Sequence, residues 1–111
     1  MKKFLRIALA AGVLAGMAHG VLAQQNYPNR PIRIIVPYPA GESVDVIARL
    51  LALRMAPLLG QQVIVDNRGG AAGNIGAEYA ARAPADGYTL MQAGMPLAAN
   101  MSLYKNLSYE L

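Results

Sequence analysis

The chain has 111 residues, with ten basic and six acidic side chains, a formal net charge of +4 and no cysteine. The absence of cysteine excludes a disulfide framework, thiolate metal sites and a cysteine nucleophile. The single histidine, His19, lies near the N-terminus, so residues 24–111 contain neither residue type that Ser-His-Asp triads, Cys-His dyads and most zinc sites require.

The first 23 residues have the features of an export signal. Three basic residues precede an apolar run, 7–17, which is too short to span a bilayer as a helix. Residues 21–23 (VLA) then predict cleavage after Ala23, and an uncleaved membrane anchor is the alternative. This segment holds three of the ten basic residues and none of the acidic ones. The remainder is therefore nearly neutral and offers no basic surface for nucleic acid.

The next segment predicts an extended lead-in, a strand and a helix. Pro28 and Pro31 disfavour helix in residues 24–31. Residues 32–36 (IRIIV) are β-branched and almost continuously apolar, which is typical of a strand buried on both faces in a parallel sheet. A helical pattern then runs from Ser43, the expected N-cap, to a terminating Gly60. Its apolar residues at helical spacing are Val44, Ile47, Ala48, Leu51, Met55, Leu58 and Leu59.

Strands and helices continue to alternate towards the C-terminus. Residues 63–65 (VIV) predict a second strand, and residues 74–82 a second helix that ends in the turn 83–87. Residues 88–91 predict a third strand, and a further helix is expected to begin within 97–104. This order indicates an α/β fold with parallel strand pairing.

Two loops follow the first two predicted strands and precede helices. They are residues 38–43 (YPAGES) and residues 67–74 (NRGGAAGN). Ligands of open parallel sheets bind at this position, and backbone N–H groups at helix N-termini favour anions. The two loops could therefore form an anion site, or they could simply use glycine and proline to reverse the chain. The glycine spacing that starts at Gly70 matches neither the dinucleotide nor the P-loop motif.

Two charged side chains near these loops each allow two interpretations. Arg68 could pair with a ligand carboxylate, or it could brace Asp66 or a helix end, which is the commoner arrangement. Asp45 could form hydrogen bonds to the backbone or to ordered water near a ligand, or it could serve only as an acidic residue in the first turn of a helix.

Four stretches of the sequence resemble one protein family. They are YPNRPIRIIVPYPAG, SVDVIARLLA, GQQVIVDNRGGAAGNIGAEYAARAPADGYTL and SLYKNLSYEL. They are similar to the periplasmic substrate-binding proteins of tripartite tricarboxylate transporters, the Bug family, over residues 27–111. The resemblance implies the first part of a two-domain, hinged (type II) periplasmic-binding-protein fold of the α/β class, truncated within domain 1. Residues 24–111 would be a partial first α/β domain.

The resemblance also implies a function and a set of site residues. The protein would be a monomeric periplasmic receptor, neither an enzyme nor dependent on a cofactor, that delivers a small carboxylate to inner-membrane transporter subunits. The two loops would hold one carboxylate of the ligand, and the segment after the third strand would complete the wall. The implied ligand-binding residues are Tyr38, Pro39, Ala40, Gly41, Glu42, Ser43, Asp45, Asn67, Arg68, Ala72, Gly73, Asn74, Gly94 and Met95.

The sequence departs from the family pattern at four of these loop positions. Glu42 replaces the second glycine of P-A-G-G-[ST], Gly69 and Ala72 replace a proline and a glycine of N-R-P-G-A-G-G-N-I-G, and Met95 stands near a common small hydroxyl residue. A carboxylate of Glu42 facing the pocket would repel an anionic ligand and favour one that carries an amine or amide. Alternatively, its side chain turns to solvent and only its backbone N–H matters.

Because the resemblance covers only the first part of the family's length, the second domain, the hinge and half of the site would lie outside the chain. We therefore expect the chain alone to bind a carboxylate weakly or not at all. One alternative is a truncated remnant or accessory interaction protein with an exposed apolar surface. Another is a small exported enzyme that uses Asp45, Asp66 and Asp86, although these carboxylates show no recognisable pairing.

Overall fold

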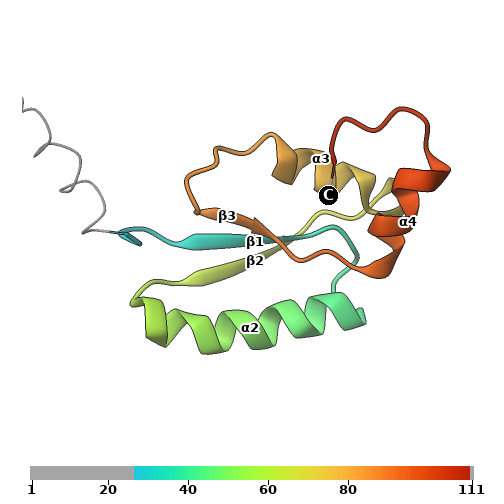
Figure 1. Ribbon diagram of the computed structural model, residues 1–111. Helices are drawn as coiled ribbons and strands as arrows, with labels where there is room; N and C mark the ends of the chain where they lie inside the picture. Colours follow the sequence, from blue (N-terminus) through green and yellow to red (C-terminus); the bar gives the residue numbers. More distant parts are fainter. Residues whose placement is uncertain (1–26, 111) are drawn as a thin grey trace, which may run out of the picture.

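The computed structural model describes residues 27–110, which form an α/β fold (Figure 1). The predicted export signal lies outside the described residues. The elements in chain order are β1 (Ile32–Val36), α2 (Ser43–Leu59), β2 (Val63–Asn67), the 3-10 turn η3 (Ala71–Gly73), α3 (Asn74–Ala81), β3 (Thr89–Met91) and α4 (Met95–Leu103). The predicted alternation of strands and helices is confirmed, and the bounds of β1 agree with the prediction.

The three strands form one parallel sheet in the order β2-β1-β3. Helix α2 packs on one face of this sheet, and α3 and α4 lie on the other (Figure 1). A right-handed crossover explains this placement, because the chain moves outward from β1 to β2 and then returns across β1 to reach β3. The loops after β1 and β3 therefore leave adjacent strands towards opposite faces, which is the usual position of a ligand site in such sheets.

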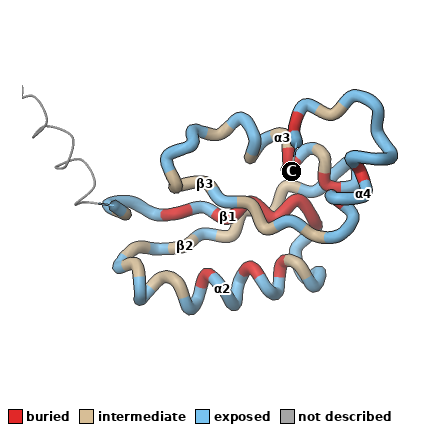
Figure 2. The backbone as a smooth tube through the Cα atoms, in the orientation of Figure 1, coloured by how far each residue is buried: buried red, intermediate tan, exposed pale blue. Residues whose placement is uncertain are grey.

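The core is centred on β1, where every residue except Arg33 is buried (Figure 2). On the α2 face, Ile34 and Val36 pack with small residues of that helix. On the opposite face, Leu97 of α4 packs with residues of α3 and of the C-terminal segment. A continuously apolar strand is required here because β1 has a helix layer on each side.

Helix α2 buries small residues and exposes large ones. Ala48 and Ala52 are buried, whereas Leu51 is 43% exposed and Leu58 is 85% exposed. The alanines allow the helix to approach the sheet closely, whereas several larger apolar side chains, such as Leu58, point away from it. The apolar spacing therefore predicted the helix correctly but did not identify which residues are buried.

The start of α2 differs from the prediction by one residue. Ser43 is already helical, and the N-cap is Glu42, with φ −74° and ψ 164°. The Glu42 carbonyl accepts the first helical hydrogen bond from the Val46 N–H at 3.0 Å, which explains why the helix begins at Ser43. The Glu42 side chain makes no capping hydrogen bond. The predicted end is confirmed, because Gly60 is the C-cap in the left-handed conformation.

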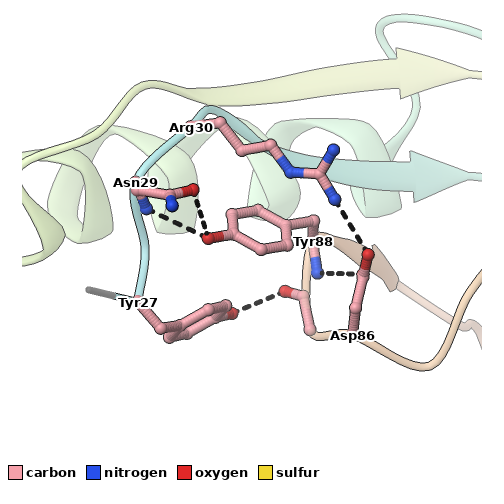
Figure 3. Close-up of polar contacts among 6 residues, drawn as sticks. Tyr27, Asn29, Arg30, Asp86 and Tyr88 are labelled. Carbon is pink, nitrogen blue, oxygen red and sulfur yellow. Dashed lines mark hydrogen bonds and ion pairs between the residues drawn. The ribbon is translucent and has the colours of Figure 1, made fainter. Parts of the chain in front are cut away.

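A polar clamp holds the lead-in against the turn that precedes β3 (Figure 3). It consists of Tyr27, Asn29, Arg30, Asp86, Gly87 and Tyr88. The Tyr88 hydroxyl donates to Asn29 Oδ1 at 2.9 Å, and the Arg30 guanidinium carbon lies 4.2 Å from the centre of the Tyr88 ring. Arg30 also pairs with Asp86 at 2.8 Å. Residues 28–30 are therefore bent, which corrects the predicted extended conformation.

We predict that Glu42→Asp stabilises the protein. Aspartate keeps the negative charge at the N-terminus of α2 and has the short side chain that can accept a capping hydrogen bond, which contributes about 1 kcal/mol. Urea unfolding followed by circular dichroism measures the change, with the exposed Glu110→Asp as control. A free energy of unfolding equal to or below that of the parent chain would contradict the prediction.

Candidate functional site at the carboxyl edge of the sheet

Three loops meet where the strands end: residues 38–43 after β1, residues 67–74 at the end of β2, and residues 92–94 between β3 and α4. The Arg68 N–H donates to the Val36 carbonyl at 2.8 Å, and the Gln92 N–H donates to the Ile35 carbonyl at 2.9 Å. The segments that follow β2 and β3 therefore both leave the sheet beside the end of β1. A Cβ atom at Gly69 would lie 3.5 Å from the Pro39 nitrogen. The first two loops, which the sequence predicted to flank a site, are thus side by side.

The ring of Tyr38 lies beneath these loops. It is 8% exposed, and a Cβ atom at Gly73 or at Gly94 would lie within 3.4 Å of opposite edges of the ring. Glycine at position 94 therefore leaves space that the ring fills, whereas a Cβ at Gly73 would come closest to Leu97 Cδ1, at 3.1 Å, and to the Pro37 carbonyl, at 3.3 Å. The Tyr38 hydroxyl is buried and has no hydrogen-bond partner among the residues that the structure describes.

A closed polar network fixes the first loop to α2 and β2. Asp45, which is 2% exposed, accepts hydrogen bonds at Oδ2 from the Gly41 N–H and from Arg49 Nε, both at 2.9 Å. Its Oδ1 accepts from Asn67 Nδ2 at 2.9 Å. Asn67 Nδ2 also donates to the Tyr38 carbonyl at 3.2 Å, and Asn67 Oδ1 accepts from Arg49 at 3.0 Å. The side chains of Asp45 and Asn67 therefore hold the shape of the loop.

The network also determines the charge of Asp45. Hydrogen bonds from Arg49, from the Gly41 N–H and from Asn67 lower the pKa of Asp45 to about 2. The same ion pair raises the pKa of Arg49. Asp45 is therefore ionised at neutral pH, and its charge is balanced within the protein. Asp45 therefore does more than serve as an acidic residue in the first turn, because it accepts a hydrogen bond from the loop backbone at Gly41. Whether a ligand lies close to it stays a prediction.

Arg68 makes the bracing interaction that the sequence suggested. Its Nε lies 3.1 Å from Asp66 Oδ2, and its guanidinium carbon lies 3.6 Å from the centre of the Tyr79 ring. These contacts hold the guanidinium on the second loop. Whether it also contacts a ligand stays a prediction.

The remaining predicted residues form the rim and floor of the three loops. Exposed residues are Pro39, Ala40, Gly41, Glu42, Ser43, Ala72 and Met95, Gly73 is buried, and Asn74 and Gly94 are partly buried. Met95 is 84% exposed, so it projects from the rim. The Glu42 side chain is exposed, as expected if it turns to solvent, but its orientation relative to a ligand stays a prediction.

Sequence reasoning missed three residues that support the loops. Arg49 could have been found, because it lies four residues after Asp45, the spacing of a helical ion pair. Asn100 and Tyr109 bond to the second loop from 26 to 35 residues away, and no local pattern indicates this.

Other features of the described chain lie away from the loops. A cavity of about 460 Å³ borders the end of α3 near Tyr79, Arg82 and Pro84, and one of about 660 Å³ lies along α2 and β2. Within residues 27–110 there is no group of three or more His, Cys, Asp or Glu side chains that could hold a metal ion. No helix in this range is long and apolar enough to cross a membrane.

Comparison with known proteins identifies the family. The family model described as "Tripartite tricarboxylate transporter family receptor" matches residues 47–111. BugT of Bordetella pertussis is 48% identical over 99 residues, covering 87% of this chain and 30% of BugT. A protein from the TAR-I ttuE-ttuC' intergenic region of Agrobacterium vitis is 43% identical over 108 residues, covering 97% of this chain and 30% of that protein. The chain belongs to the tripartite tricarboxylate transporter receptor family.

Solved structures agree with this assignment. The periplasmic binding protein BugD is 46% identical, with a TM-score of 0.72 over 76% of this chain and 28% of BugD. MatC of Rhodopseudomonas palustris with bound malate is 34% identical, with a TM-score of 0.67 over 76% of this chain and 29% of MatC. An R. palustris protein with adipate is 37% identical, with a TM-score of 0.66 over 76% of this chain and 28% of that protein. The described residues therefore have the fold of part of a periplasmic binding protein, and the chain spans about 30% of the length of the curated relatives cited above.

We predict that Asp45→Asn reduces the acid sensitivity of folding. Because the native pKa of Asp45 lies below its ordinary value of 3.8, the unfolded chain binds more protons between about pH 4 and pH 2. The stabilisation from the carboxylate is thus present above pH 4 and is lost as the pH falls towards 2. Thermal unfolding from pH 5 to pH 2 should show a smaller decrease in Tm for Asp45→Asn than for the parent or for Glu110→Gln. Parallel curves would show that the network does not depend on this charge.

We predict that Tyr38→Phe stabilises the protein. The substitution keeps the ring between the loops and removes a buried hydroxyl that has no partner in the described part of the chain, and the desolvation of such a group costs about 1 to 3 kcal/mol. Thermal unfolding should give a higher Tm than that of the parent, whereas Tyr104→Phe, at a 45% exposed position, should leave it unchanged. A lower Tm would indicate that the Tyr38 hydroxyl has a partner in solution, such as a bound water molecule.

Proposed function

We propose that residues 27–110 form one wall of a carboxylate-binding site in a periplasmic solute receptor that serves a tripartite tricarboxylate transporter. The observation that carries this proposal is the meeting of three exposed, glycine- and alanine-rich loops at the carboxyl edge of the sheet. Family membership supports it, because related structures contain malate or adipate. The family description is that of a receptor, which favours solute binding over an enzymatic role.

Backbone groups are the proposed anion donors. The first N–H groups of a helix have no intrahelical partner, and the first helical N–H with a partner in α2 is that of Val46. The N–H groups of Ser43 and Val44 therefore lie at the positive end of a helix of 17 residues. Arg49 balances the charge of Asp45 just behind them, so the Asp45 carboxylate adds little repulsion against a bound anion.

The location and partners follow from the same proposal. We propose export with cleavage after Ala23, action as a monomer in the periplasm, and transfer of the solute to inner-membrane transporter subunits. In longer receptors of this family, residues beyond the matched part would supply the second domain and the opposite wall. The chain alone should therefore still bind a dicarboxylate, but weakly, with a Kd of roughly 1 to 10 mM.

One observation favours a second candidate, an accessory interaction protein. The exposed apolar residues of α2 include Leu50, Leu53 and Leu58, which are 59%, 71% and 85% exposed. An exposed apolar surface of this kind is typical of a protein contact. Absence of carboxylate binding would favour this candidate.

The test is a titration of the ¹⁵N-labelled chain with malate and with adipate, followed by two-dimensional NMR. Ser43→Pro removes one proposed donor, because proline has no N–H, and both the first helical position and the extended Glu42 before it are compatible with proline. We expect Ser43→Pro to bind malate about tenfold more weakly, as expected for the loss of a hydrogen bond to a charged group. Ser43→Ala keeps the N–H and should bind within about twofold of the parent.

Two outcomes would contradict the proposal. Equal affinities of Ser43→Pro and Ser43→Ala would exclude the backbone donor at this position. A carboxylate site at the three loops would be excluded if the NMR shifts are confined to residues outside 38–45, 67–74 and 92–97. It would also be excluded if no NMR signal shifts at 20 mM ligand. Micromolar affinity of the chain alone would leave the location of the site intact but contradict the part of the proposal that gives this chain only one of two walls.

A further inference from the structure

Three polar side chains meet behind the glycine-rich loop. Asn100 of α4 is 3% exposed, and its Nδ2 donates to the Ala72 carbonyl at 2.9 Å and to Asn74 Oδ1 at 2.8 Å. Tyr109, from the segment after α4, is also buried, and its hydroxyl donates to the same Asn74 oxygen at 2.6 Å. Two buried donors therefore converge on one end of one amide.

The direction of each hydrogen bond follows from chemistry. A backbone carbonyl can only accept, so Asn100 must present its Nδ2 group to Ala72. The atom of Asn74 that faces this NH₂ group must then be an acceptor, which is Oδ1. The Tyr109 hydroxyl, which can donate or accept, must donate to it. The backbone oxygen of Ala72 thus sets the orientation of the Asn74 amide through Asn100.

The orientation of Asn74 leaves its Nδ2 group on the side away from both donors. This group donates to no protein acceptor within residues 27–110. Since the Tyr38 hydroxyl is the buried side-chain atom without a partner in this range, the Asn74 Nδ2 group is accessible to solvent or to a ligand. Asn74 is the first residue of α3, directly after the loop. From this position its NH₂ group can add two N–H donors to a helix N-terminus that already favours anions.

We propose that Asn100 and Tyr109 are positioning residues, which hold the Asn74 amide so that its Nδ2 group donates to a ligand carboxylate. This inference rests on the proposed function of the three loops. Rotation of the amide would place an NH₂ group against that of Asn100, lose both bonds to Oδ1 and present an oxygen to the anion. The bond to Ala72 also holds that residue in the left-handed conformation, with φ 55°.

The test is a double-mutant cycle in the full 111-residue chain, with malate as the probe. Tyr109→Phe should weaken malate binding about fivefold, whereas Tyr104→Phe should remain within about twofold of the parent. In an Asn74→Ala background, Tyr109→Phe should have no further effect on affinity, because the residue on which it acts is gone. An equal loss in both backgrounds would overturn the proposal, since Tyr109 would then act through general stability.

A second measurement does not depend on a ligand. The side-chain amide signal of Asn74 can be identified by its loss in Asn74→Asp, and it should shift in Tyr109→Phe but not in Tyr104→Phe. Asn100→Asp removes the donor to both acceptors and should shift this signal as well, while Asn106→Asp, the same change at an exposed position, should not. An unmoved Asn74 signal would overturn the positioning role. A shifted signal in a chain that binds no malate would instead overturn the donor role together with the proposed function.

Discussion

The carboxylate of Asp45 is the point through which the first loop, helix α2 and strand β2 are joined. A loop of this kind has few side chains with which to hold its shape, because proline, alanine and glycine contribute no hydrogen-bonding groups beyond the backbone. Asp45 supplies the missing acceptor for the Gly41 N–H, and Arg49 and Asn67 donate to the same carboxylate. The position of the loop relative to the other two therefore depends on an acidic residue in the first turn of the helix that follows it.

The same carboxylate explains how an anion site could exist without a cationic side chain at its centre. Arg49 is committed to Asp45 and Asn67, and Arg68 to Asp66 and the Tyr79 ring, so both guanidinium groups already have partners within the protein. The donors that remain for an anion are backbone N–H groups, whose partial charges are fixed in direction by the helices, and the proposed Nδ2 group of Asn74. Such donors are individually weak in water and become stronger when solvent is excluded. A receptor that binds in this way needs a second wall, which is consistent with the greater length of the relatives.

The sequence predicted the fold better than the role of each site residue. Strand β1 was predicted to the residue because a run of β-branched side chains between two turns has few alternatives. The start of α2 was predicted one residue late, because serine is a commoner N-cap than glutamate. The backbone conformation that makes Glu42 the N-cap depends on the folded loop and is not visible in the local sequence. The spacing of apolar residues identified α2 as a helix, but it could not show that Ala48 and Ala52 face the sheet while Leu58 does not. The distance between α2 and the sheet decides which side chains of the helix are buried, and this distance depends on elements that are remote in sequence.

The two asparagines of the second loop show what distinguishes a supporting residue from a candidate ligand residue. In Asn67, the amide nitrogen bonds to Tyr38 and Asp45 and the oxygen to Arg49, so both ends are used within the protein. In Asn74, two donors converge on the oxygen, while the nitrogen donates to no acceptor in the described part of the chain. Both residues were predicted from the sequence as equal members of one site, because residue type and spacing do not encode which hydrogen bonds are already satisfied. The nitrogen of Asn74 is therefore able to donate to a ligand, whereas both ends of the Asn67 amide are used to hold the loops in place.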